Sequence, residues 1–213
     1  MLNLLQHMVE AESPSSHPGS HRLMRATLTS ALESLDFIVR PVQPNGGCRH
    51  IYARPTDRTR GEGVQLLIGH YDTVWPLGTV AHRPFEVDGN IVRGPGVLDM
   101  KAGLVQIVFA LKALQELELT PALLPVVFVN ADEEIGSRTS TSTIRRLARQ
   151  AERAFVMEPA LGEDGLIKTE RKGIGRFTIT VHGKAAHAGL DPEGGASAIL
   201  ELSHIIQTLF GLN

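Results

Sequence analysis

The feature that most constrains this chain is an alternation of short apolar runs with helical segments. The runs 64–69 and 123–130 are apolar at nearly every position, as expected of strands that are covered on both faces, and 154–157 is a third predicted strand. Between them, 100–119 repeats apolar residues at helical spacing, and 141–151 is a second predicted helix. This order predicts an α/β fold, with a mixed sheet whose central strands are parallel and sandwiched by helices.

The N-terminal part of the sequence adds elements to this core. Helices are predicted over 2–9 and 21–35, separated by a Ser/Pro/Gly loop. Two extended runs, 37–42 and 50–54, flank the turn signal Pro44–Gly47 and are expected to be neighbouring strands.

Composition limits the class of protein and of partner. With 213 residues and 42% hydrophobic residues the chain can form a substantial core, and its formal net charge is -2. Because there is no basic excess, nucleic acid and membrane partners are not expected. The single cysteine, Cys48, allows no internal disulfide, and no secretory leader is recognisable, so a cytoplasmic location is expected.

The composition changes near residue 170, where a second domain is predicted to begin. Residues 173–183 alternate apolar and polar residues as a strand would, and 196–212 is a predicted helix. One strand and one helix cannot cover their own apolar faces. We therefore expect the helix stripe to be covered by residues outside this chain or by another chain; the stripe consists of Ile199, Leu202, Ile206 and Leu209.

Metal-ligand residue types follow each of the three predicted parallel strands. They are His70 and Asp72 after the first, Asp132, Glu133 and Glu134 after the second, and Glu158 after the third, with Asp99 at the head of the intervening helix. Parallel strands place their carboxyl ends at one edge of the sheet. Several carboxylates converging there are costly unless cations offset them, and divalent metal ions accept such mixed His/carboxylate sets.

Four sequence motifs, taken together and in their order along the chain, resemble those of a known family. They are His70–Val74 (HYDTV), Gly94–Gly103 (GPGVLDMKAG), Asp132–Ser137 (DEEIGS) and Met157–Pro159 (MEP). In this order they resemble the M20-type co-catalytic zinc exopeptidases, which include acetylornithine deacetylase and aminoacylase. The stretch 171–189 is most similar to the glutamate carboxypeptidase (carboxypeptidase G2) branch. The resemblance covers nearly the whole chain, as an N-terminal part of such an enzyme.

The resemblance implies a two-zinc site. His70 and Glu158 would bind one zinc and Glu134 the other, with Asp99 bridging the two ions and Glu133 acting as the general base. Cobalt or manganese would also suit mixed nitrogen and oxygen ligands.

Two further residues take roles from the resemblance. Asp72 would accept the second N–H of the His70 imidazole and so orient the ring. His187 would come from a lid domain, reach the active site of a neighbouring subunit and stabilise the oxyanion, which implies a homodimer. Residues 1–170 would form the catalytic metal-binding domain and 171–213 the first part of the lid/dimerisation domain. The last zinc ligand would lie beyond Asn213, so one well-formed and one weak metal site are expected.

Other interpretations of the same residues stay open from sequence alone. Asp99 could instead cap the helix predicted to begin near Met100, because Asp is a favoured N-cap residue. Glu158 could be a turn residue, and His187 part of a plain loop. The leading hypothesis for function is a metal-dependent hydrolase that cleaves a peptide or amide bond next to a free carboxylate. The alternatives are a deacylase of N-acyl amino acids and a catalytically silent metal-binding fragment.

Overall fold

The computed structural model describes the chain except residues 44–46, 59–62, 171, 174 and 213. Three of the four residues of the predicted turn 44–47 therefore lie outside the described residues. The structure divides into two compact units, Met1–Ile167 and Lys168–Asn213, and each is described by itself.

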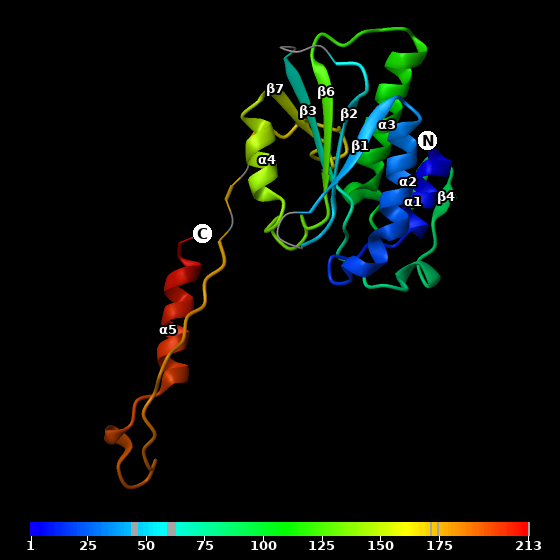
Figure 1. The fold of residues 1–213 in the computed structure, drawn as a ribbon. Coiled ribbons are helices and arrows are strands. Elements are labelled where there is room, and N and C mark those ends of the chain that lie inside the picture. Colours follow the sequence, from blue (N-terminus) through cyan, green and yellow to red (C-terminus); the bar gives the residue numbers. More distant parts are fainter. Residues whose placement is uncertain (44–46, 59–62, 171, 174, 213) are drawn as a thin grey trace. The chain divides into compact units, whose positions relative to one another are not determined.

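The first unit is built around a five-stranded mixed sheet (Figure 1). Its strands are β1 (Phe37–Val42), β2 (His50–Pro55), β3 (Val64–His70), β6 (Leu124–Asn130) and β7 (Ala151–Val156). The strand order is β1-β2-β6-β3-β7, in which β6, β3 and β7 are parallel and β1 and β2 are antiparallel. The predicted mixed sheet with parallel central strands is confirmed.

Helices cover both faces of this sheet. The longer ones are α1 (Leu2–Glu10), α2 (Arg22–Glu33), α3 (Ala102–Glu116) and α4 (Thr141–Ala148). Along β6, Val127 and Val129 belong to the larger core with α1, α2 and α3, whereas Val126 and Phe128 pack with α4 residues on the other face. Figure 1 shows α4 on one side of the sheet and α1–α3 on the other. Burial on both faces explains why the central strands are continuous apolar runs.

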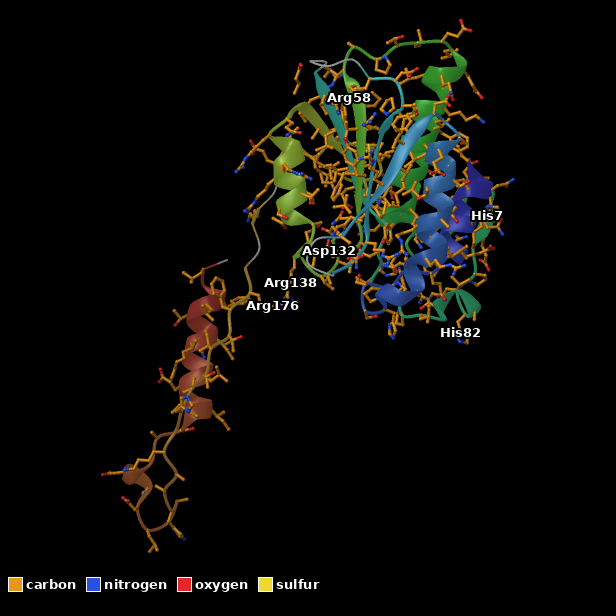
Figure 2. All side chains as sticks on the ribbon, viewed as in Figure 1. His7, Arg58, His82, Asp132, Arg138 and Arg176 are labelled. Atoms are coloured by element: carbon orange, nitrogen blue, oxygen red, sulfur yellow. The ribbon has the colours of Figure 1, made fainter. Side chains whose placement is uncertain are left out.

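The register of the parallel strands brings their carboxyl ends together. His70 of β3 lies opposite Asn130 of β6, and Ile68 of β3 lies opposite Val156 of β7. Residues that directly follow these strands therefore share one edge of the sheet. In Figure 2, Asp132 lies at this edge and Arg58 lies at the opposite end of the unit.

The segment between β3 and α3 contains elements that the sequence did not indicate. After the short helix η3 (Thr79–Ala81), β4 (Glu86–Asp88) and β5 (Ile91–Arg93) form a small antiparallel hairpin. The wide turn η4 (Val97–Lys101) follows, and α3 begins at Ala102 rather than near Met100. The later start has a local cause, because Asp99 and Met100 adopt non-helical backbone angles.

The second unit contains the short helix η5 (Pro192–Gly194) and the helix α5 (Ala198–Phe210). Ser197 caps α5, since its hydroxyl accepts a hydrogen bond from the Leu200 amide. None of the residues described within 173–183 is in a strand, so the strand prediction for this segment is wrong. A strand requires a hydrogen-bonded neighbour, and the one bridge described in this unit joins Lys184 to Ala196.

The apolar stripe of α5 is exposed within this chain. Its residues Ile199, Leu202, Ile206 and Leu209 are 84%, 38%, 57% and 47% exposed, respectively. What covers the stripe stays a prediction. Among the described residues, no helix is both long enough and apolar enough to span a membrane.

Candidate metal centre

His70, the last residue of β3, is buried and held in one tautomer. Its side chain is 1% exposed, and its backbone N–H donates to the Met100 sulfur at 3.0 Å. Its ring Nδ1 lies 2.9 Å from the backbone carbonyl of Asp72. Because a carbonyl oxygen only accepts, Nδ1 must carry a proton. In the neutral imidazole, Nε2 then carries no proton and presents a lone pair.

That Nε2 faces three carboxylates. It lies 3.0 Å from Asp99 Oδ1, 3.4 Å from Glu158 Oε1 and 3.9 Å from Glu133 Oε2. A lone pair cannot bond to acceptor oxygens, so the arrangement is favourable only with a cation between them or a proton on Nε2. Burial alone would lower the pKa of His70, but Asp72 and Glu158 raise that pKa to about 11 in the absence of metal.

The spacing of these atoms fits a shared metal ion. Zinc binds nitrogen and oxygen ligands at about 2.0–2.2 Å, so two ligand atoms of one tetrahedral ion are about 3.3–3.6 Å apart. The distances from Nε2 to Asp99 and Glu158 are close to this range. Two groups of three residues have ligand atoms within 4.8 Å of one another, namely His70, Asp99 and Glu134, and His70, Glu133 and Glu158. The predicted metal ligands and the predicted base are thus brought together.

Asp99 reaches the site from η4. Its side chain is 57% exposed, and α3 is capped at Lys101 with no hydrogen bond from a side chain, so the alternative of Asp99 as helix cap is wrong. Gly96 permits the close approach of η4 to the strand end. Its φ is +69°, and a Cβ placed there would lie 2.6 Å from the Thr73 methyl group.

Asp72 makes contacts that differ from the prediction for this residue. Its carboxylate was expected to accept the imidazole N–H, but the Asp72 backbone carbonyl does so, and the nearest carboxylate oxygen is 3.5 Å from Nδ1. The fully buried carboxylate instead accepts the backbone N–H groups of Glu133 and Glu134, both at 3.2 Å. Asp72 therefore links the end of β3 to the acidic pair that follows β6.

The acidic pair lies in a charged and partly buried environment. Burial raises the pKa of Glu133, and the negative charges of Glu158 and Asp72 raise it further. Burial and the charge of Asp99 likewise raise the pKa of Glu134. Like charges held this close favour a bound cation.

Asp132, directly before the pair, anchors the loop that carries it. One Asp132 oxygen accepts from the Thr139 amide at 2.6 Å and the Thr139 hydroxyl at 2.7 Å, and the other accepts from the Ser140 hydroxyl at 2.6 Å. Burial by itself would raise the pKa of Asp132, but the Ser140 and Thr139 hydrogen bonds outweigh burial and lower the pKa. These hydrogen bonds favour the ionised Asp132 carboxylate, which anchors the loop 132–140.

His50 completes this anchor. Its Nδ1 accepts from the Ala131 amide at 3.2 Å, so Nε2 carries the proton and donates to the Thr139 hydroxyl at 3.1 Å. Burial lowers the pKa of His50, which keeps the ring neutral as this arrangement requires. The sequence did not single out His50, because nothing in its spacing connects it to 131–140.

Three other buried polar residues near the site were not predicted. Ser13 and Ser15 belong to the Ser/Pro/Gly loop, a composition typical of the surface, yet both are buried. Lys101 is 1% exposed, and its ammonium group donates to the Met8 carbonyl at 2.8 Å. Burial lowers the pKa of Lys101 to about 8. The sequence carried one available signal, namely three serines within residues 13–16, in the loop between the first two predicted helices.

His187 belongs to the second unit. It is exposed, and its Nδ1 accepts the backbone N–H groups of Gly189 and Leu190 at 3.1 and 3.2 Å. A neutral ring then carries its proton on Nε2. The role of His187 toward an oxyanion stays a prediction.

Comparisons with known proteins agree on one family. The family model described as peptidase family M20/M25/M40 matches residues 66–210. Carboxypeptidase G2 from a Pseudomonas species is 36% identical over 147 residues, which are 69% of this chain and 35% of that protein. Acetylornithine deacetylase from Pasteurella multocida is 30% identical over 190 residues, covering 87% of this chain and 47% of that protein.

A solved structure shows the same fold. Aminopeptidase PepT from Bacillus cereus superposes with a TM-score of 0.70 at 19% identity, over 96% of this chain and 55% of that one. The chain thus spans between about a third and a half of the curated relatives named above.

Proposed function

The chain belongs to peptidase family M20/M25/M40, and from this premise we propose that it forms the metal-binding part of a zinc-dependent hydrolase. The bond cleaved would be a peptide or amide bond next to a free carboxylate. A glutamate carboxypeptidase-like exopeptidase is the leading form of this proposal, and its main support is the likeness to carboxypeptidase G2.

One observation carries the metal part of the proposal. The Nδ1 proton of His70 is committed to a carbonyl, so Nε2 faces the carboxylates of Asp99, Glu158 and Glu133, and these charges must be offset by a proton on Nε2 or by a shared cation. With a cation in place, the same groups form a good ligand set. His70, Asp99 and Glu158 would hold one zinc, and Glu134 the second, with Asp99 shared.

The residues of the site then divide into ligands and a base. Bound zinc would supply Lewis acidity toward the scissile carbonyl and lower the pKa of a bound water. Glu133 is 47% exposed and has a raised pKa, so its carboxylate is accessible to a water and is a stronger base than an ordinary glutamate. Asp72 holds the Glu133 and Glu134 backbone in place through their amides.

A second candidate is a deacylase of N-acyl amino acids. The likeness to acetylornithine deacetylase favours it, and it would use the same ligands with a different substrate pocket. A third is a metal-binding chain without catalysis of its own.

Zinc binding by the metal-depleted chain tests the site. Glu158→Gln and Glu134→Gln should each lower the amount of zinc retained from a limiting supply. Glu33→Gln, which changes an exposed carboxylate at the end of α2, should not. An unmodified chain that retains no zinc, or retention unchanged in both site variants, would contradict the proposal.

Metal-dependent release of amino acid from two substrates then separates the three functions. Faster release of glutamate from an N-acyl glutamate supports the exopeptidase, and faster release of ornithine from N-acetylornithine supports the deacylase. Zinc binding with neither release supports the third candidate.

The remaining parts of the proposal concern assembly and location. We propose that 1–170 is the catalytic domain, that 171–213 begins a lid/dimerisation domain, and that His187 acts on the oxyanion in a homodimer. The exposed apolar stripe of α5 supports a further partner surface. A cytoplasmic location is favoured by the single cysteine, Cys48.

A further inference from the structure

The N-terminal segment Glu12–Ser15, here called the strap, runs beside the metal-bearing strand end. The Thr73 amide donates to the Ser13 carbonyl and the Ser15 amide donates to the Thr73 carbonyl, both at 3.0 Å. Pro14 and Thr73 form a parallel bridge. The strap therefore extends the backbone pairing past His70, along the residues that include Asp72.

The Ser15 side chain makes a contact that backbone pairing does not require. Its hydroxyl is buried and donates to Asp72 Oδ2 at 2.8 Å, while the next acceptor, the Thr73 carbonyl, is at 3.2 Å. A hydroxyl has a single proton, and the shorter contact to a charged oxygen is the stronger one. Ser15 is thus committed to the Asp72 carboxylate.

This contact is the shortest that the described structure gives for the Asp72 carboxylate. The two amides that the carboxylate accepts, from Glu133 and Glu134, are longer at 3.2 Å. The Oδ2 atom receives both the Ser15 hydroxyl and the Glu134 amide. By holding Oδ2, Ser15 helps to fix the orientation of the Asp72 carboxylate. That orientation determines where the carboxylate can accept the Glu133 and Glu134 amides.

We propose that Ser15 is a positioning residue of the metal centre, acting through Asp72 on the backbone of Glu133 and Glu134. The inference rests on the proposed function, because it takes Glu134 as a ligand. Residues that orient ligands typically change metal affinity about 10- to 100-fold when removed. Ser15 contacts Asp72 and does not contact a proposed ligand itself. We therefore expect a smaller effect, a loss of metal affinity of about 3- to 10-fold in Ser15→Ala.

Ser13 offers a matched control within the strap. It is also a buried serine, and its hydroxyl donates to the Tyr71 carbonyl at 2.5 Å rather than to Asp72. Ser13→Ala therefore removes one strap hydrogen bond of similar burial while leaving the Asp72 carboxylate with all its donors. A general loosening of the strap would affect both variants, whereas positioning through Asp72 would affect only one.

The test is cobalt affinity, measured by competition with a chelator together with the visible absorption spectrum of bound cobalt. Affinity is expressed per folded chain, with the folded fraction taken from circular dichroism of the same sample. Ser15→Ala should weaken cobalt binding about 3- to 10-fold and shift the spectrum. Ser13→Ala should change affinity less than twofold, even where its melting temperature falls.

Equal affinities in the two variants would overturn the inference, as would a Ser15→Ala spectrum that matches the unmodified chain. Glu134→Gln keeps this result separate from the proposed function. If Glu134→Gln weakens cobalt binding and Ser15→Ala does not, only the inference about Ser15 fails. If neither does, Glu134 is not a ligand, and the assignment of Glu134 to the second zinc fails together with the inference.

Discussion

Gly103 is the position at which one added carbon would most directly disturb the metal centre. It lies in the first turn of α3, and a Cβ built there would be 1.9 Å from the Met157 carbonyl oxygen. Relief to even 3.0 Å requires a relative movement of about 1.1 Å between α3 and Met157. Met157 is itself tied to β3, since its amide donates to the Ile68 carbonyl at 2.9 Å.

This movement would displace Glu158, the next residue. Metal sites tolerate changes in ligand distance of about 0.2 Å, several times less than the shift required. Gly103→Ala should therefore weaken zinc binding at least about 10-fold. It should also lower the free energy of unfolding by up to about 2 kcal/mol, because an overpacking cost of about 1–3 kcal/mol is offset in part by the gain of about 1 kcal/mol that alanine brings to a helix.

Chelator competition and urea unfolding would measure the two effects. Gly19→Ala is the control, because a Cβ at Gly19 meets no atom within 4 Å. If Gly103→Ala bound zinc like the control and unfolded at higher urea, the contact between α3 and Met157 would not constrain the site, and the reasoning would be refuted.

Two further predictions concern protons. Burial lowers the pKa of His50 from 6.5, so below pH 6.5 the unfolded chain binds a proton that the folded chain does not, and stability should fall as the pH drops from 6.5 to 5.5. Urea unfolding should show a smaller fall in His50→Asn, and equal slopes would contradict the assignment. The pKa of His70 is raised to about 11 without metal, which stabilises the metal-free chain fully below pH 6.5 and progressively less as the pH rises toward 11. Zinc uptake at pH 7.5 should therefore release about one proton from His70. Calorimetry in buffers of different ionisation enthalpy would detect this proton, and its absence would mean that His70 is neutral before zinc binds.

The central strands β3 and β6 could be predicted from sequence because they are largely buried and therefore read as apolar runs. The residues that follow them share one edge because the two strands are parallel. The edge strand β7 is mostly exposed, so its burial could not be predicted from its apolar residues. The hairpin of β4 and β5 was missed, since three-residue strands are too short to show a period. The strand expected over 173–183 had the alternation of a strand but no neighbour with which to pair.

Within the site, residue types were predictable and contacts were not. The sequence indicated His70, Asp99 and Glu158 by their places at strand and helix ends. It could not show that Asp99 sits in non-helical backbone, that Asp72 binds amides, or that Ser15 is buried. Each of these depends on contacts between residues that are distant in sequence, which no local pattern records.

The parallel arrangement of β6, β3 and β7 also bears on how the chain acquires metal. His70, Glu134 and Glu158 follow three different strands, and α3 and α4 must cross the sheet before these strands can pair. No short segment of the nascent chain carries a full ligand set. Parallel pairing of high contact order forms slowly, because distant segments must meet before any contact stabilises them. At the proposed site, metal capture would therefore be a late event in folding, and the bound ion would stabilise the finished sheet rather than nucleate it.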